Sequence, residues 1–265
     1  MKVGFIGAGN MATAILTGIA KAGALDKKDV YVSNRSKAKL DRIAKDFSFE
    51  TSTDNKVVLK KEKDVVFLCV KPQIFDEIKD DLKKHVGKEQ LIVSIMAGKS
   101  IDYIKKALGV KKVVRVMPNT PCLVGAGISS FTPSEEAKKD KNLAKVHEIL
   151  ESIGEVLDVE EKYVNAVTQV AGASPAWIFM MIEALADGGV MCGLPRDMAY
   201  RLAKASVYGS GKLAIEKGSH PGVLKDMVTS PAGTTIEGVK VLEDKGFRGA
   251  LIDAVVAAYE KTKKL

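Results

Sequence analysis

The chain has 265 residues, of which 46% are hydrophobic and 28% charged, the composition of an ordinary globular protein with enough apolar material for a sizeable core. Its formal net charge is +8, but the lysines alternate with acids in the runs 60–64 and 138–141, which we interpret as solvated faces. No nucleic-acid motif accompanies them, so we expect no nucleic-acid partner. The positive field would instead help to attract an anionic cofactor and substrate.

The cysteines and histidines indicate neither disulfides nor a metal site. Cys69, Cys122 and Cys192 are odd in number and widely spaced, which favours reduced thiols and a cytoplasmic location. The three histidines stand alone, without metal-ligand spacing.

No signal peptide or membrane span is expected. The first residues lead directly into a strand. The most apolar stretch, residues 176–194, is interrupted by Glu183 and Asp187, so we interpret it as a buried helix.

The N-terminus predicts a dinucleotide-binding turn. A short apolar strand, Val3–Ile6, runs into Gly-Ala-Gly-Asn-Met-Ala at residues 7–12, and an apolar helix follows to about Ala22. This is the GxGxxA pattern, in which the first glycine makes the turn, the second admits a pyrophosphate and the alanine allows close helix–strand packing. The predicted cofactor contacts here are Ile6, Gly7, Ala8, Gly9, Asn10 and Met11.

The end of the next strand, Val30–Ser33, indicates which cofactor is bound. Enzymes that use NAD usually carry an acid here, whereas this chain has Ser33, Asn34, Arg35 and Ser36. A guanidinium beside hydroxyls and an amide suits a 2′-phosphate. We therefore expect NADPH, with NADH as the alternative, although the same residues would also suit a solvated loop with a serine helix cap.

The remaining pattern predicts an α/β domain followed by a helical one. Strands are expected at 3–6, 30–33, 65–70, 91–95, 113–117, 127–131 and 156–159, with helices between most of them, as in a parallel, doubly wound sheet of the Rossmann type. Thr132-Pro133-Ser134-Glu135 has the pattern of a helix start.

Beyond Glu160 the alternation stops, which predicts domains at 1–160 and 161–265. Helices are expected at 161–170, 175–192, 196–217, 221–228, 235–242 and 248–262. Gly188 and Gly189 lie inside one of them, at a cost of roughly 1 kcal/mol each relative to alanine. Such a cost suggests close contact with another helix, for which an oligomer interface is a natural candidate.

A loop near the C-terminus has the composition of a small-anion site. Residues 230–235 read Ser-Pro-Ala-Gly-Thr-Thr and lead into an amphipathic helix. A loop of this kind directs free backbone N–H groups and a helix N-terminus at a carboxylate. Considered alone, it would also suit an ordinary Ser/Thr helix cap.

Taken together, the chain resembles the pyrroline-5-carboxylate reductase family over essentially its whole length. The resemblance rests on residues 5–12, 70–73 and 115–121 in the first part, and on 184–190, 193–195 and 228–235 in the second. It implies reduction of 1-pyrroline-5-carboxylate to L-proline, the last step of proline biosynthesis. It also implies an intertwined homodimer formed by the C-terminal helical domain, often assembled further into decamers.

The resemblance also implies roles for particular residues. Asn55 would contact the adenosine ribose, and Glu161 would lie near the substrate, although a helix-terminal acid is an equal interpretation of it. The nicotinamide contacts would be Val70, Lys71, Pro72, Met96, Ala97 and Gly98. The family is expected to have glycine where this chain has Ala232, which matters if that residue needs a positive φ.

The implied chemistry is hydride transfer to a cyclic imine carbon. Gly233, Thr234 and Thr235 N–H groups, with the Ser230 hydroxyl, would hold the substrate carboxylate, and the Thr235 hydroxyl would position or protonate the ring nitrogen. Three alternatives stay open: an imine reductase for a six-membered ring, a hydroxyacid dehydrogenase using Lys212 as acid/base, and a non-catalytic NADP-binding protein.

Overall fold

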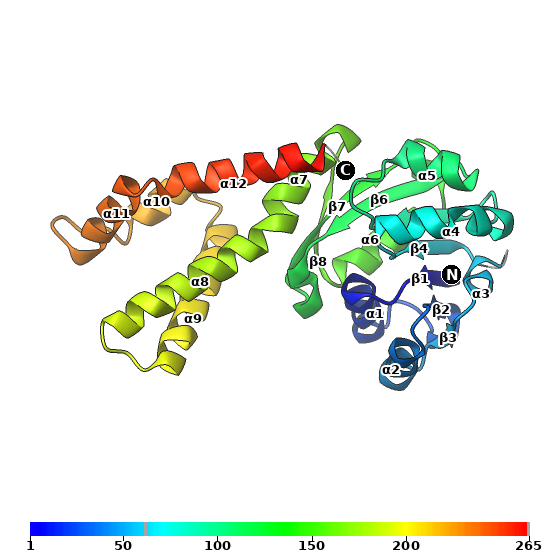
Figure 1. Ribbon diagram of the computed structural model, residues 1–265, viewed down its shortest axis with the longest axis horizontal. Coiled ribbons are helices and arrows are strands. Elements are labelled where there is room, and N and C mark those ends of the chain that lie inside the picture. The colour runs from blue at the N-terminus through cyan, green and yellow to red at the C-terminus, as the bar shows by residue number, and fades with distance from the viewer. Residues whose placement is uncertain (61–62, 264–265) are drawn as a thin grey trace. The chain divides into compact units, whose positions relative to one another are not determined.

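The structure, a computed structural model, describes residues 1–60 and 63–263. These residues form two compact units, one of residues 1–172 with the end of the chain from Lys261, the other of residues 173–260. The first unit contains a sheet covered by helices, and the second is helical (Figure 1). The segment 161–172, beyond the expected domain boundary, groups with the sheet.

The described part of the first unit has one eight-stranded sheet, in the order β3-β2-β1-β4-β5-β6-β7-β8. The strands are β1 (Val3–Ile6), β2 (Val30–Ser33), β3 (Glu50–Ser52), β4 (Val65–Leu68), β5 (Leu91–Ser94), β6 (Val113–Pro118), β7 (Gly127–Pro133) and β8 (Gly154–Asp158). Neighbouring strands are parallel except β6 and β7. The predicted parallel-dominated sheet is confirmed. Its antiparallel pair arises because residues 119–126 are too few for a crossover.

Helices cover both faces of the sheet, which is why its strands are continuous apolar runs. On one face lie α1 (Asn10–Ala22), α2 (Lys37–Phe47) and α6 (Leu143–Glu151), and on the other α3 (Lys56–Leu59), α4 (Pro72–His85) and α5 (Ile101–Leu108). Phe5 and Phe67 stack within the first core with ring centroids 4.6 Å apart. The apolar stripe of each helix thus has a sheet face to cover.

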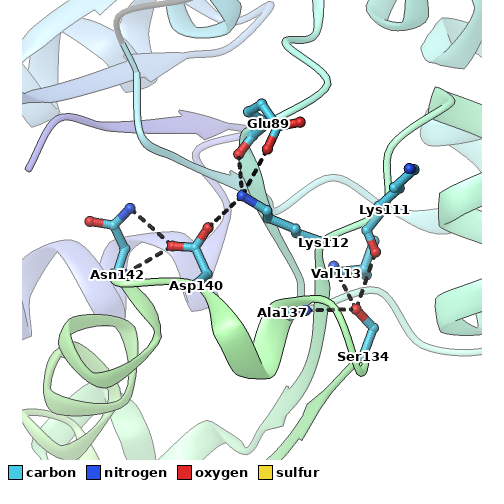
Figure 2. A network of polar contacts seen from close by, with 8 residues as sticks. All are labelled: Glu89, Lys111, Lys112, Val113, Ser134, Ala137, Asp140 and Asn142. Carbon is cyan, nitrogen blue, oxygen red and sulfur yellow. Dashed lines mark hydrogen bonds and ion pairs between the residues drawn. The ribbon is translucent and has the colours of Figure 1, made fainter.

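The predicted helix start at Thr132-Pro133-Ser134-Glu135 is wrong. Thr132 and Pro133 belong to β7, where Pro133 pairs with Val114. The Ser134 hydroxyl accepts bonds from Val113 N and Ala137 N at 3.3 and 3.2 Å and donates to Lys111 O at 3.2 Å (Figure 2). Only a 3₁₀ turn, Ala137–Lys139, follows, because strand pairing outweighs the local cap signal.

The lysine-rich run 138–141 is partly buried, contrary to expectation. The Asp140 side chain is only 6% exposed and lies 3.1 Å from Lys112 Nζ, which also contacts Glu89 at 3.0 Å (Figure 2). Bonds to Glu89 and Asp140 raise the pKa of Lys112. Asp140 Oδ1 accepts a further bond from Asn142 N at 2.9 Å. The network joins the loops that precede β5, β6 and α6.

The run 60–64 is not simply a solvated face either. Lys63 is 3% exposed, and its ammonium lies 3.1 Å from the centroid of the Tyr31 ring. Asp64 accepts a bond from Lys2 N at 2.9 Å. Lys61 and Glu62 lie outside the described residues.

A helical segment with an irregular middle leads into the second unit. It comprises a 3₁₀ turn (Glu161–Tyr163), α7 (Val164–Val167) and a π-helix (Thr168–Ala173). The gap expected between the helices 161–170 and 175–192 is therefore a widened helical turn. Such a turn accommodates Pro175, which has no N–H group. Asn119 Nδ2 donates to Ala171 O in this turn at 3.1 Å.

The described part of the second unit is helical, as predicted. It contains α8 (Ser174–Met191), α9 (Arg196–Lys217), α10 (Pro221–Asp226), α11 (Thr234–Asp244) and most of α12 (Phe247–Thr262). A Cβ on Gly189 would lie 3.3 Å from Ala199 Cβ, so this glycine lets α8 approach α9 of the same chain. A Cβ on Gly188 would meet no atom within 4 Å, so no contact among the described residues requires that glycine.

Most of the helix at residues 176–194, which was expected to be buried rather than to span a membrane, is left exposed by the single chain. Glu161–Met191 is long and apolar enough by composition to cross a membrane, and only 17% of its most apolar window is buried. Exposed apolar side chains on α8 include Phe179, Met180 and Met191, and α9 adds Met198 and Leu202. Covering them requires something outside the chain.

Candidate functional site

The glycine turn after β1 is shaped so that only glycine fits its first position. Gly7 has φ of +104°, and a Cβ there would lie 2.6 Å from the carbonyl oxygen of Cys69, which follows β4. Gly7 N donates to Ser33 O at 2.8 Å. The turn therefore lies where strand order reverses between β1 and β4, the switch point at which such sheets bind ligands.

The next glycine leaves an open cradle at the start of α1. Gly9 is the N-cap residue and has no side chain to cap the helix, and a Cβ on it would meet nothing within 4 Å. The N–H groups of Asn10, Met11 and Ala12 therefore lack intrahelical acceptors, and the first turn contains no acid. This arrangement suits a pyrophosphate. Ala12, 1% exposed, packs into the core as predicted.

The residues after β2 divide into buried and exposed groups. The Ser33 hydroxyl is fully buried and donates to Asn55 Oδ1 at 2.8 Å, which leaves the Asn55 amide nitrogen as a donor. Asn34 Oδ1 accepts a bond from Ala8 N at 3.4 Å, so this side chain supports the glycine turn. Arg35 and Ser36 are exposed.

The start of α2 is suited to an anion. Ser36 is its N-cap residue but makes no side-chain capping bond, and Lys37 and Lys39 follow in a first turn without acids. Two cations at a positive dipole end are unfavourable unless an anion lies there. Arg35 contacts only Glu77, with Nη1 and Oε2 4.0 Å apart, among the described ion pairs.

The loops after β4 and β5 complete this edge of the sheet. Lys71 is the N-cap residue of α4 and Pro72 its first residue, and the side chain of Val70 packs against the glycine turn. Ala97 and Gly98 are exposed, and Gly98 has φ of +73°. Of the predicted contacts, Ile6 and Met96 are each 1% exposed and contribute to the apolar core, so only their backbones face the site.

In the second unit, the loop 230–235 leads into α11, a helix whose first turn has no side-chain cap. The N-cap residue of α11 is Gly233, not a serine or threonine, and no side chain caps the helix. Gly233 N donates to Ser230 O at 3.0 Å, so it is not available to a ligand. The N–H groups of Thr234, Thr235 and Ile236 lack intrahelical acceptors. The ordinary-cap interpretation is therefore wrong.

The two residues before α11 have strict backbone requirements. Ala232 has φ of +57°, the left-handed region that favours glycine, so an alanine at this position carries a conformational cost. A Cβ on Gly233 would collide with the Ser230 hydroxyl. The loop therefore holds that hydroxyl beside the free N–H groups of α11.

Glu161 makes contacts that the sequence did not reveal. Its Oε1 accepts a bond from Ile101 N at 2.7 Å and lies 3.4 Å from Arg115 Nη1. Glu161 thus interacts with the N-terminus of a helix, as the alternative interpretation predicted. That helix is α5, however, and not the helical segment that begins at Glu161 itself. Burial lowers the pKa of Arg115, and Glu161 opposes this shift.

Asn119 is a structural residue that the sequence analysis left without a role. It is 9% exposed, and its Oδ1 accepts a bond from Ile128 N at 3.0 Å while its amide holds the π-helix. The sequence signal for this role is only an asparagine directly after a predicted strand. Lys212, the candidate acid/base of a dehydrogenase, lies 3.6 Å from Glu216 with its side chain 56% exposed, as expected of a solvated lysine.

Within the described residues, His, Cys, Asp and Glu side chains form no group of three that could hold a metal ion. The three cysteines are free.

The sheet reversal, the glycine turn and the open start of α1 define a dinucleotide-binding protein of the Rossmann type. Residues 2–98 match the family described as "NADP oxidoreductase coenzyme F420-dependent", and residues 161–265 match "Pyrroline-5-carboxylate reductase dimerisation". The chain belongs to the pyrroline-5-carboxylate reductase family, which confirms the predicted resemblance, the NADP-type coenzyme domain and the helical dimerisation domain.

Individual relatives support this assignment along the whole chain. The pyrroline-5-carboxylate reductase of Escherichia coli (strain K12) is 42% identical over 100% of this chain and 98% of that protein. The structure of the Coxiella burnetii pyrroline-5-carboxylate reductase, 34% identical, covers 99% of this chain and 97% of that one with a TM-score of 0.87. The Plasmodium falciparum pyrroline carboxylate reductase with NADP bound is 31% identical, with a TM-score of 0.88 and coverage of 100% and 97%.

Proposed function

We propose that this chain reduces 1-pyrroline-5-carboxylate to L-proline with NADPH, NADH being the alternative donor. The observation that carries the proposal is the helix start at Gly233, which offers free N–H groups and the Ser230 hydroxyl to a carboxylate. Family membership supplies the substrate class.

For the coenzyme, the glycine turn is a cradle that side chains would fill, so the residues present fit a dinucleotide. In the proposal, the turn from Gly7 to Met11 holds the pyrophosphate: the N–H groups of Gly7 and Ala8 are used within the protein and fix the turn, and those of Asn10 and Met11 face the ligand. The Asn55 amide donates to the adenosine ribose, and Ser33 fixes its orientation. Asn34, Arg35, Ser36 and the α2 N-terminus receive the 2′-phosphate, which accounts for two lysines in a helical first turn.

The nicotinamide ring lies, in this proposal, between residues 70–72 and 96–98, and it supplies the hydride when bound. The exposed backbone of Ala97 and Gly98 permits close approach to a flat ring. Ile6 and Met96 act through their backbones because their side chains lie in the core.

For the substrate, Ser230 Oγ and the N–H groups of Thr234 and Thr235 hold the carboxylate, while Gly233 leaves space for that hydroxyl. The Thr235 hydroxyl donates a hydrogen bond to the ring nitrogen of the neutral imine and relays a proton to it from water, since a threonine hydroxyl is too weak an acid to act alone. Once protonated, the imine is electrophilic enough to accept the hydride, so orientation is the main task of the protein. Glu161 Oε1 is used by α5 and Arg115, so in this proposal Glu161 acts on the substrate region through these two partners rather than by a direct contact of that oxygen with the substrate.

The test is imine-dependent NADPH oxidation by three variants. Thr235→Ala should lower kcat by about a hundredfold, the general acid–base range, with NADPH affinity unchanged. Thr235→Ser should restore much of the rate because it keeps the hydroxyl. Thr234→Ala is the matched control, since it keeps the N–H group that the proposal uses. Wild-type rates in Thr235→Ala would remove Thr235 from the mechanism, and a wild-type enzyme that reduces only other imines would overturn the substrate.

We further propose that the chain acts as a homodimer, assembled into decamers, in the cytoplasm, with neither a nucleic acid nor a membrane as partner. The exposed apolar side chains of α8 and α9 lie in the segment that matches the dimerisation family, which supports self-association. The free thiols suit a reducing compartment. Sedimentation of the purified chain tests the assembly, and a monomer at micromolar concentration would contradict it.

A further inference from the structure

A partly buried polar cluster that joins α4 to Lys99 and α5 has no part in the function proposed above. Its centre is Asp76 of α4, whose two carboxylate oxygens are bonded by different residues. Lys99 Nζ donates to Oδ2 at 2.8 Å, and the Tyr103 hydroxyl donates to Oδ1. The carboxylate therefore joins α4 to the segment that begins α5, a helix lying beside it (Figure 1).

The cluster is well supported by its surroundings. Lys99 has a side chain only 17% exposed, and its ammonium lies 4.5 Å from the centroid of the Tyr103 ring. The ring packs against the buried Phe75 with centroids 6.2 Å apart. Lys79 Nζ adds a bond to the Tyr103 hydroxyl at 3.1 Å. Bonds from Lys99 and Tyr103 hold the pKa of Asp76 below its usual value, so it stays ionised at neutral pH.

The position of Lys99 in the chain connects the cluster to the proposed nicotinamide segment 96–98. It directly follows Gly98, so its ion pair fixes the end of the loop 95–98. The beginning of that loop is fixed by bonds from Ile95 N to Leu68 O at 3.2 Å and from Met96 N to Ser94 Oγ at 3.3 Å. Ala97 and Gly98 thus form a short exposed span between two fixed points.

Asp76 also has a defined position relative to the other proposed nicotinamide segment. It follows Pro72 by four residues in α4, about 6 Å along the helix axis. A helix is stiff over this length, so a residue bonded to Asp76 is held at a set distance from residues 70–72.

We propose that Asp76, through Lys99 and Tyr103, is a positioning residue that sets the spacing between segments 70–72 and 96–98. It makes no contact with the coenzyme in this scheme. The inference rests on the proposed function, because that function places the nicotinamide ring between these segments. Displacing the nicotinamide ring by about 1 Å lowers the reaction rate by up to about a hundredfold, so an ion pair that fixes the spacing has a direct effect on turnover.

The main test compares Asp76→Asn with Glu136→Gln. The first variant keeps the shape of the carboxylate but removes its charge. The second variant removes a similar ion pair away from the loop, in which Glu136 Oε2 lies 2.7 Å from the Nζ of Lys105 in α5. Turnover with NADPH should fall about ten- to a hundredfold in Asp76→Asn only. Affinity for 2′,5′-ADP, which lacks the nicotinamide, should stay at the wild-type value in both.

Amide hydrogen exchange in the coenzyme-free protein provides a readout independent of activity. Exchange of residues 97–99 should accelerate in Asp76→Asn and in Tyr103→Phe, and stay unchanged in Glu136→Gln. Lys99→Met should add nothing to Asp76→Asn, because both remove the same interaction. If Asp76→Asn does not fold, Tyr103→Phe takes its place as the test variant in the exchange measurement.

Two results would overturn the inference. One is wild-type turnover and exchange in Asp76→Asn. The other is an equal loss of 2′,5′-ADP affinity, which would indicate general damage to the coenzyme domain. If the wild-type chain does not reduce the imine, the proposed function fails, while the exchange measurements still decide whether Asp76 fixes the loop.

Discussion

Replacing Arg35 should change coenzyme preference without changing the fold. Arg35 follows β2, and its side chain is 76% exposed; among the described ion pairs it has only the one to Glu77, at 4.0 Å. An exposed pair of this length contributes little to stability, so Arg35→Ala should unfold at the wild-type temperature. Whatever the variant loses is then a loss of ligand binding.

The size of the loss follows from the exposure of the site. A hydrogen bond to a charged group contributes about 1.5–3 kcal/mol, and solvent screening at so open a position favours the lower value. Since 1.36 kcal/mol corresponds to a factor of ten, kcat/KM for NADPH should fall about tenfold. NADH has no 2′-phosphate, so its kcat/KM should not change.

The assay is initial-rate kinetics with both coenzymes at fixed imine concentration. Arg42→Ala is the matched control, because Arg42 is also an exposed arginine of the α2 region, 3.4 Å from Asp46 and one turn or more from the helix start. An unchanged NADPH-to-NADH ratio in Arg35→Ala, or an equal fall with both coenzymes, would refute the assignment of this loop to the 2′-phosphate.

Three further predictions concern stability. Ala232→Gly should stabilise the chain by about 0.5–1 kcal/mol, because relief of a left-handed alanine outweighs the entropy of an added glycine, and a lower urea midpoint would contradict this. Lys112→Met should destabilise it by about 1–3 kcal/mol, since it leaves Asp140, 6% exposed, without its cation; the double variant with Asp140→Asn should recover part of the loss in thermal unfolding. The bond from Lys105 lowers the pKa of Glu136 to about 2 from 4.5, so this pair stabilises the fold above pH 4.5 and loses that contribution as pH falls toward 2. Glu136→Gln should therefore show a shallower acid-unfolding profile, and an unchanged profile would be the contrary result.

Most of the sheet was predictable because its strands are continuous apolar runs bounded by turns. The strand β3 was missed because it has only three residues at the sheet edge, none of them buried. The direction of β7 was missed for another reason: apolar pattern does not encode direction, and only the short connection 119–126 indicates it. At Thr132 and Pro133, local cap chemistry predicted a helix where a long-range pairing prevailed.

The glycine turn after β1 was predictable because a local motif combines its residues within a few positions. Contacts between distant residues were not. The bonds from Ala8 N to Asn34 and from Ile101 N to Glu161 each depend on how segments meet in space. The burial of residues 176–194 could not be decided from one chain either, because apolar composition does not say whose atoms will cover it.

The bond between Glu161 and Ile101 N has a consequence for mutagenesis. A single oxygen atom both neutralises a buried guanidinium on β6 and caps the helix that starts right after the exposed span at Ala97 and Gly98. Truncating Glu161 would loosen two elements at once, sixty residues away in sequence from one of them. A low rate in a Glu161 variant would therefore not prove that Glu161 contacts the substrate. Only a rate defect that disappears at saturating substrate would indicate such a contact.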